Sequence, residues 1–547
     1  MPEAATVRPG RTVLGTGYLV TALAAVVVVA MLAILLWIVG VNALRWFWPA
    51  TVWQLALDDG RVVVGEVIDR QRMPTLEEGS GENRVLVKTG NRDRARRDHE
   101  WISESRITTA VRSESVVRIT RASFGNAYGW IHRVTDLEGR GVEVVDPGEL
   151  GDLLAEGERL RARREELSRE ISRVRRPLTE LELRAAGLRR SDHGQTESGR
   201  REAEELADAI GRLTAELRPR IDELEAERQT VINRLDRGRL TLVSGDLEID
   251  VPLSQVIEVE WPNTMGLGRR LAVTIRNFWV FLISDPREAN TEGGIFPALF
   301  GTVLMVLLMS LAVMPLGVLT AVYMSEYAQE GIGLTIAHHA VNNLAGVPSI
   351  VIGIFGLTFF VYGLGGGIDR IFFSETLPKP SFGTGGILWA SLTLALLTIP
   401  VVVVATREGL HAVPGSWREG ALALGATKWQ TLRRIVLPAA MPGILTGLIL
   451  AVGRAVGEVA PLMLTGAVKL APRLPVDGDA PFLHLERKFM HLGFHIFDVS
   501  MQSPNVEAAK PMAFATTLVL LGLVLIINLT AIVIRRRLRM AYRLMEI

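Results

Sequence analysis

Long apolar runs alternate with highly charged sequence along this chain. The first run covers roughly residues 19 to 41, and five more crowd into the last half of the chain. Those five lie at about 296 to 324, 345 to 364, 385 to 405, 438 to 466 and 512 to 534. A helix needs about 20 apolar residues to cross the hydrocarbon core of a bilayer, and each run reaches that length. The pattern therefore predicts an all-α polytopic membrane protein with six transmembrane helices.

The first run follows a short basic segment with Arg8 and Arg11, so a secretory signal peptide is one interpretation. The run of about 23 apolar residues is too long for a signal core, which takes about 7 to 15. Trp46 and Trp48 follow it without a small-residue cleavage site. We therefore predict a permanent span with these tryptophans in an interfacial belt.

Basic residues in short loops and at chain ends indicate how the spans are oriented, because they favour the cytoplasm. One basic cluster follows the last span at 535 to 539, and another lies in the loop at about 406 to 436. Six spans place both clusters and the N-terminus on the cytoplasmic side. The expected division is a cytoplasmic N-terminus and first span (1–41), a periplasmic insert (42–295) and a five-span permease domain (296–547).

The insert is charged and contains no spanning run, so it is predicted to be a soluble α+β domain with β-rich edges. Residues 55 to 68 alternate around an Asp-Asp-Gly turn, which is typical of a β-hairpin. Residues 239 to 259 show similar short β-branched stretches around a Ser-Gly-Asp turn.

The centre of the insert, at about 150 to 236, is predicted to be a helical hairpin of coiled-coil type. Apolar residues recur there every seven positions, and a turn-rich break lies at 194 to 199. Pro177 predicts a kink or break in the first arm. The hairpin is either a docking arm for a partner outside the membrane or a self-packed structural hairpin with a solvated charged face.

The loop between the fourth and fifth spans, at 416 to 438, carries a spaced motif. Its residues are Glu419, Gly420, Ala421, Gly425, Ile435, Leu437 and Pro438. A short polar helix that ends at a glycine can act as a lever with a bendable end. The spacing Glu-x-Ala-x3-Gly-x9-Ile-x-Leu-Pro resembles the signature of ATP-binding-cassette (ABC) importer permeases. That resemblance implies a coupling helix that inserts into a separate ATPase subunit; an ordinary cytoplasmic loop is the alternative.

Two ionisable residues, Arg454 and Glu458, interrupt the fifth apolar run one helical turn apart. Ionised groups inside a membrane are costly, which makes this pair a candidate for the substrate pathway. The planar guanidinium suits an oxyanion, and the carboxylate could hold it in place or accept a proton from the anion. The alternative is a buried pair that fixes helix packing without contacting solute.

Two further segments narrow the resemblance. One, at 343 to 351, contains Gly346, Pro348 and Ser349, and the other, at 453 to 461, reads Gly-Arg-x-x-Gly-Glu-x-x-Pro. With the coupling motif they resemble the PstA family of phosphate-import permeases over about residues 290 to 547. The resemblance implies inorganic phosphate as solute and transport roles for the Arg-Glu pair. It also implies a PstC-type second permease, a PstB-type ATPase dimer and an extracytoplasmic phosphate-binding protein as partners, while the long insert departs from the family.

Composition excludes several function classes. The balance of 60 basic against 59 acidic residues gives no electrostatic case for nucleic acid as a partner. The absence of cysteine excludes disulfides and thiolate metal sites. No phosphate-cradling Gly-x4-Gly-Lys-Ser/Thr motif occurs, so another chain must handle ATP. We expect a multi-pass inner-membrane permease, not an enzyme, in contact with lipid and without a cofactor. The alternatives are a permease for sulfate, molybdate or phosphonate, or a membrane-anchored sensor.

Histidines are the remaining candidates for a metal site. His484, His491 and His495 have the spacing of one helix face, with Asp498 nearby. A simple amphipathic surface helix is the preferred interpretation of this segment. The pair at 338 and 339 is expected to lie at the membrane interface without ligating a metal.

Overall fold

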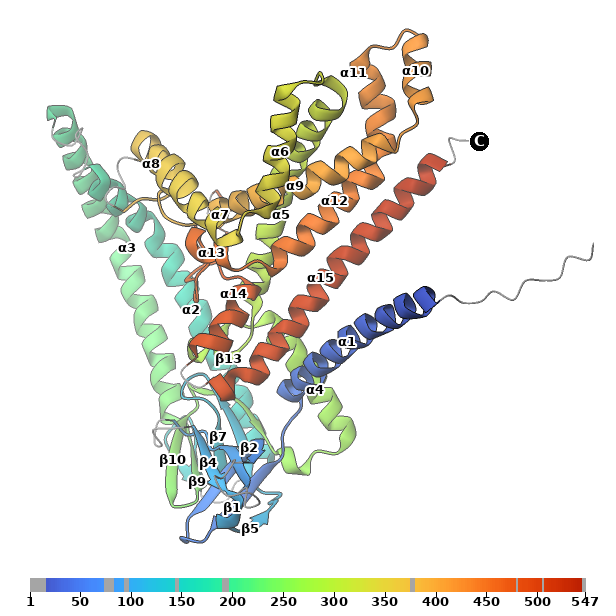
Figure 1. Ribbon diagram of the computed structural model, residues 1–547. Helices are drawn as coiled ribbons and strands as arrows, with labels where there is room; N and C mark the ends of the chain where they lie inside the picture. The colour runs from blue at the N-terminus through green and yellow to red at the C-terminus, as the bar shows by residue number, and fades with distance from the viewer. Residues whose placement is uncertain are drawn as a thin grey trace, which may run out of the picture.

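The computed structural model describes residues 16–72, 83–92, 98–142, 147–188, 196–373, 379–478, 481–503 and 506–543. A bundle of long helices carries a β-rich part at one end, and a helical hairpin projects from that part beside the bundle (Figure 1). The first residues of the predicted N-terminal segment, and residues 194 and 195 of the predicted turn, lie outside the described residues.

The described residues contain six helices that are long and apolar enough to cross a membrane, which confirms the predicted number. The first two are formed by α1 (Thr16–Phe47) and by α5 (Phe296–Val322) with its π-helical end η5 (Tyr323–Tyr327). The third joins α7 (Ser349–Phe355), η6 (Gly356–Gly365) and α8 (Gly366–Phe372), and the fourth is α9 (Ile387–His411). The last two are α11 (Lys428–Thr431) with η8 (Leu432–Val436) and α12 (Leu437–Gly457), and α15 (Val506–Arg543).

Helix α9 forms the centre of the bundle. Its Leu394, Leu397 and Val402 are fully buried, in one apolar cluster with Met309 of α5 and Ala455 of α12. The outward faces of the other spans are apolar and exposed, which is the surface that lipid covers in a membrane protein.

Two predicted spans have the wrong limits, and proline explains both. The third begins at Ser349, because helix α6 (Ile332–Gly346) ends first and Val347 before Pro348 is extended. The fifth was expected to continue to residue 466, but α12 ends at Gly457. Since Pro461 cannot donate a hydrogen bond and its ring would clash with the Gly457 carbonyl, a short separate helix, α13 (Ala460–Thr465), follows instead.

The predicted α+β insert contains two antiparallel sheets with the same strand order. The first sheet has the order β4-β3-β2-β1-β5, and the second has β10-β9-β7-β6-β11 with β8 beside β7. The strands of the first are β1 (Val52–Leu57), β2 (Val62–Arg72), β3 (Asn83–Lys88), β4 (His99–Ser103) and β5 (Ile107–Val111). Those of the second are β6 (Val117–Arg121), β7 (Ala127–Thr135), β8 (Gly141–Val142), β9 (Arg239–Ser244), β10 (Leu247–Pro252) and β11 (Val256–Glu260).

The two sheets also share their irregularities, so the β-rich part is a tandem repeat. In each sheet the register shifts once between the second and third strands and once between the first and last strands. Gly65 and Gly129 occupy equivalent places in the second strands. A Cβ atom there would lie 2.2 Å from the Lys88 carbonyl oxygen and 2.4 Å from that of Val243, so a side chain would push the next strand away. The sequence analysis missed this repeat, because the two sheets share their hydrogen-bond register but not their side chains.

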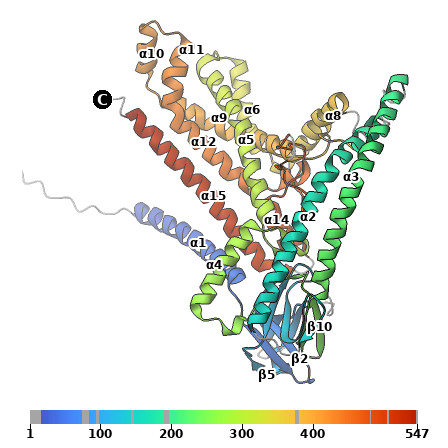
Figure 2. The same ribbon diagram turned by 180° about the vertical axis from the view of Figure 1, so that it is seen from behind.

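The helical hairpin is inserted into the second of these sheets, between β8 and β9. Its arms are α2 (Pro147–Leu188) and α3 (Glu197–Arg237). Leu167 and Ile171 pack against Leu224 and Val231 along the seam. Of the kink or break predicted at Pro177, the break is wrong, because α2 continues to Leu188 with its apolar seam on α3 on both sides of the proline. Figures 1 and 2 both place the distal part of the hairpin on the side of the bundle where α8 lies.

Candidate functional site

The coupling motif forms a helix and a turn at the end of the bundle farthest from the β sheets (Figure 1). Helix α10 (Gly415–Ala423) carries Glu419, which is exposed, and Ala421, which is buried. Gly425 follows with a φ of +84° and open space around the position of a Cβ atom. Glycine is therefore favoured at this position by the left-handed backbone, which costs any other L-residue roughly 1–2 kcal/mol, and not by a lack of space for a side chain. Gly420 lies within α10 with open space around it.

The apolar end of the motif fixes this loop in the bundle. Ile435 lies in η8, and Leu437 and Pro438 begin α12; all three are half-buried. Leu432 and Val436 beside them are buried against Val322 of α5 and Leu410 of α9. A displacement of the loop must therefore move the ends of several spans.

Arg418 is a positioning residue that the sequence analysis did not single out. Its Nη1 donates to the Val413 carbonyl at 2.8 Å, and its Nη2 donates to the Leu410 carbonyl at 2.8 Å and to Glu326 Oε1 at 3.0 Å. The ion pair joins α10 to the end of the α5 span across 92 residues of sequence. A basic residue in a basic loop gave no signal of this contact.

Exposed apolar side chains surround the coupling loop at the same end of the bundle. Trp417 and Leu422 of α10 are partly exposed, Leu424 is 91% exposed, and Trp429 of α11 is 54% exposed. Large apolar side chains grouped at the tip of a bundle, around a loop, are typical of a protein-binding surface.

Arg454 and Glu458 lie at the end of α12, and not within one continuous helix as the predicted fifth span implies. Arg454 is in the last turn, while Glu458 has extended backbone and caps the helix. Arg454 Nε lies 3.4 Å from Glu458 Oε1, and the two side chains are 33% and 21% exposed. Among the described residues, the terminal nitrogens of Arg454 have no hydrogen-bond partner. The guanidinium therefore keeps its two-pronged edge available to an oxyanion.

The two segments that carried the PstA resemblance meet in the structure. Gly346 ends α6, and Pro348 and Ser349 start α7, which packs against α13 directly after Glu458. Val347 and Val459 border one buried cluster between these helices. Sequence reasoning treated the segments separately, although they form one packed layer beside the Arg-Glu pair.

The histidines do not form the expected surface helix. His491 accepts a hydrogen bond from Gly493 N at 3.1 Å at the start of α14 (Leu492–Phe497), and His495 lies within that helix. Both are buried, and burial lowers the pKa of His491 to about 3 and of His495 to about 4. His484 lies outside α14 and contacts Asp477 at 3.0 Å. No group of three metal-ligating side chains occurs in the described part of the chain.

Of the earlier pair at 338 and 339, His338 contacts the Arg407 guanidinium at 2.8 Å. Burial and that cation lower the pKa of His338, so it is neutral when it contacts Arg407. This contact ties α6 to α9.

A polar junction that the sequence analysis missed joins the insert to the bundle. It is built on a short segment before α5 that contains β12 (Pro286–Arg287), η4 (Glu288–Asn290) and β13 (Glu292–Gly293). Lys88 of β3 lies 3.0 Å from Glu292. Burial opposes the charge on Glu292, but the Lys88 ammonium outweighs it and lowers the pKa of that carboxyl. On the other side, Asn290 Nδ2 donates to the Lys469 carbonyl at 2.7 Å, in the loop before α14.

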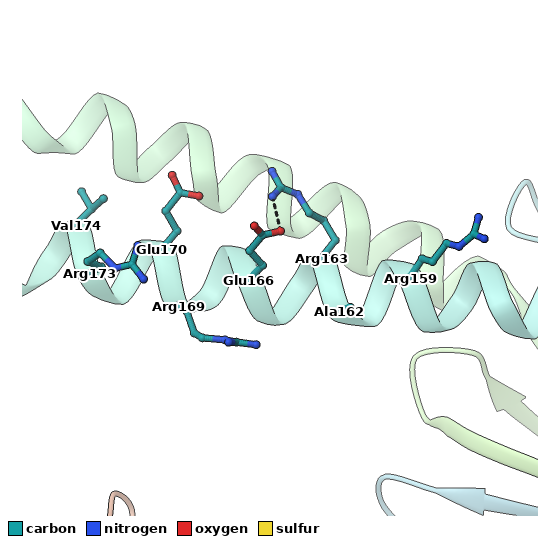
Figure 3. Close-up of a pocket in the computed structure, with 8 residues that line it drawn as sticks. All are labelled: Arg159, Ala162, Arg163, Glu166, Arg169, Glu170, Arg173 and Val174. Atoms are coloured by element: carbon teal, nitrogen blue, oxygen red, sulfur yellow. Dashed lines mark hydrogen bonds and ion pairs between the residues drawn. The ribbon is translucent and has the colours of Figure 1, made fainter. Parts of the chain in front are cut away.

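Charged side chains of both signs line a hollow on α2 (Figure 3). They are Arg159, Arg163, Glu166, Arg169, Glu170 and Arg173. Arg163 lies between two carboxylates, because it donates to Glu166 at 2.8 Å and to Glu227 of α3 at 2.7 Å. Glu170 accepts from Arg220 of α3 at 2.9 Å. The Arg163–Glu227 and Arg220–Glu170 pairs link the two arms, which favours the self-packed hairpin over the docking arm.

Comparison with known proteins gives matches over the helical bundle. Residues 314–540 match the family described as the binding-protein-dependent transport system inner membrane component. The probable ABC transporter permease protein YqgI of Bacillus subtilis is 34% identical over 256 residues, 46% of this chain and 81% of that protein. The phosphate transport system permease protein PstA of Yersinia pestis is 32% identical over 256 residues, 47% of this chain and 77% of its own length. PstA 1 of Mycobacterium tuberculosis is 37% identical over 193 residues, 35% and 58% of the two chains.

Proposed function

This chain belongs to the family of binding-protein-dependent transport system inner membrane components, and we propose that its solute is inorganic phosphate. It is the permease of an ABC importer and a multi-pass inner-membrane protein. Such a permease works with an ATPase and a substrate-binding protein. The proposal assigns it a PstC-type second permease, a PstB-type ATPase dimer and a phosphate-binding protein, by its similarity to the PstA relatives.

The Arg454–Glu458 pair carries the phosphate proposal. A partly exposed guanidinium at the break between α12 and α13 offers paired donors, which suit a tetrahedral oxyanion better than a point charge does. Glu458 fixes the Nε side of the guanidinium through the 3.4 Å contact. Its carboxylate is also placed to repel a fully deprotonated anion or to accept a proton from a protonated one, which distinguishes protonated phosphate from sulfate.

Helix α12 connects the Arg454–Glu458 pair to the coupling loop. α10 is held on α5 by the Arg418–Glu326 ion pair, and η8 leads directly into α12, whose last turn carries Arg454. In the proposed cycle, the ATPase binds the exposed apolar tip around α10 and displaces it. The rigid α12 transmits this displacement to the Arg-Glu pair at its other end.

Proteoliposomes that contain the assembled complex test the solute assignment. We expect Arg454→Met with Glu458→Gln to assemble and hydrolyse ATP but to move almost no phosphate. Arg454→Lys restores little transport, because an ammonium cannot reproduce the two-pronged contact. Near-normal phosphate uptake by the double variant would assign the pair to helix packing. Uptake of sulfate, molybdate or phosphonate in preference to phosphate by the unmodified complex would assign another oxyanion.

The periplasmic side of the insert is part of the proposal. The coupling loop lies at the opposite end of the bundle from the β sheets (Figure 1), so an ATPase in the cytoplasm requires the insert to lie outside. Protease added to intact spheroplasts should cleave the chain between α2 and α3, near Gly194. Cleavage that occurs only after the membrane is opened would place the insert in the cytoplasm.

A further inference from the structure

Helix α4 (Leu267–Ile283) joins the β sheets to the α5 span and has one buried face. Val273 and Phe281 are buried on that face. Arg270 Nη2 donates to the Pro262 carbonyl at 3.1 Å, and Arg276 Nη2 donates to Glu260 Oε1 of β11 at 3.0 Å. Arg276 therefore ties α4 to β11 of the second sheet, and Arg270 ties it to the turn that follows β11.

The C-terminal half of α4 lies at the outer ends of the spans. The Phe47 ring at the end of α1 contacts the Phe278 and Phe281 rings, with centroids 5.4 Å and 5.3 Å apart. Asn277 Nδ2 donates to the Phe47 carbonyl at 3.1 Å. Ile295 N, just before α5, donates to the Phe281 carbonyl at 2.8 Å. These contacts fix α4 at the level where α1 and α5 leave the bilayer.

The opposite face of α4 is a stripe of large apolar side chains that the chain leaves uncovered. They recur every fourth residue and are Leu267, Leu271, Ile275, Trp279 and Ile283, with exposed fractions of 79%, 56%, 53%, 58% and 68%. Residues four apart are neighbours on a helix surface and each step turns by about 40°, so the stripe is continuous along α4 and winds across about half of its circumference.

We propose that this stripe lies in the outer leaflet of the membrane, with α4 parallel to the bilayer surface. The helix has 17 residues and carries three arginines, Arg269, Arg270 and Arg276, so it is unsuited to cross the hydrocarbon. A large apolar face opposite polar contacts is typical of interfacial helices, and tryptophan favours that depth.

The stripe continues the lipid-facing surface of α1, whose Leu44 is 57% exposed and whose following Trp48 is 38% exposed. Continuity with that surface, beside Phe47, identifies lipid as the occupant. Since Arg276 ties α4 to β11 of the second sheet, immersion of α4 holds the tandem sheets against the outer membrane surface.

The natural absence of cysteine makes the test direct, because each single-cysteine variant carries one label. Ile275→Cys and, on a second preparation, Leu271→Cys are labelled with an environment-sensitive fluorophore. The full chain is assembled with its partner subunits in nanodiscs. The lipids carry a nitroxide quencher either near the headgroup or near the end of the acyl chain. Glu216→Cys, exposed on α3 of the hairpin, is the matched control.

The headgroup-proximal quencher should reduce fluorescence at both α4 positions more than the deep quencher does, since an interfacial helix lies about 5–10 Å into the headgroup and acyl boundary. The control should show no quenching by either lipid. Stronger quenching by the deep label would mean that α4 crosses the bilayer. Unquenched α4 labels in the assembled complex, or quenching that disappears when the second permease joins, would mean that protein covers the stripe; each of these results overturns the proposal. Because the readout needs no transport, it is independent of the solute assignment.

Discussion

Replacing Arg418 should uncouple ATP hydrolysis from transport while leaving the solute path intact. Arg418→Met removes the ion pair with Glu326 and the two hydrogen bonds to the Leu410 and Val413 carbonyls. Met keeps a similar length of apolar chain, so the change acts mainly on the polar contacts that hold α10 against α5. Glu326→Gln is the milder change, because it removes the charge of the acceptor and leaves both carbonyl contacts in place.

The contacts give a graded expectation for the two variants. A hydrogen bond from a charged group contributes about 1.5–3 kcal/mol. We take the lower end of this range for all the contacts of Arg418 together, because about a quarter of the Arg418 side chain and of the Glu326 side chain is exposed. A loss of about 1.5 kcal/mol lowers the ratio of α10 bound to α5 to α10 released from it by about 12-fold. Glu326→Gln loses only a partly exposed ion pair, about 0.5–1 kcal/mol, which lowers this ratio by about 2- to 5-fold.

The assay is the number of solute molecules transported per ATP hydrolysed in proteoliposomes with the full complex. We expect this ratio to fall from the unmodified protein to Glu326→Gln and further to Arg418→Met. Arg433→Met is the matched control, since Arg433 is an exposed basic residue at the same end of the bundle. The reasoning is refuted if Arg418→Met couples normally. It is also refuted if the control loses coupling equally, because the effect would then come from general charge.

Three further predictions concern the coupling turn, the junction and the buried histidine. Gly425→Pro or Glu419→Lys should abolish ATP-driven uptake at normal membrane insertion, since proline cannot adopt a φ of +84° and lysine reverses the charge on α10; uptake at matched expression measures this. Glu292→Ala should destabilise the insert by about 3–5 kcal/mol, because it leaves Lys88 buried and unpaired. Lys88→Met combined with Glu292→Leu should recover most of the lost stability, measured by thermal unfolding of the purified chain. The free energy of unfolding should decline as pH falls below about 6.5, because His491 binds a proton in the unfolded chain but not in the folded one, where its pKa is about 3. In melting curves, His491→Asn should reduce this dependence of stability on pH. An unchanged dependence would count against the prediction.

The number of spans and the coupling loop were accessible from sequence because both are set by local rules. A bilayer imposes a minimum length on each apolar run, so six runs predict six helices whatever their packing. The coupling motif occupies one continuous stretch, and its glycine meets a backbone requirement that is visible at Gly425 alone. The seven-residue apolar repeat likewise predicted a hairpin, since it reports which side of each helix is buried.

Tertiary structure decided the features that depend on residues far apart in the chain. The Arg418–Glu326 pair spans 92 residues and the Lys88–Glu292 pair spans 204, and no local pattern encodes either partner. The histidine segment has the spacing of a surface helix, but the surrounding bundle buries it. The tandem sheets repeat a hydrogen-bond register that varied side chains can satisfy, and the stripe on α4 becomes visible only once the other face is covered. Periodicity in a sequence shows which residues share a side of an element, whereas burial and pairing depend on the other elements that pack against it.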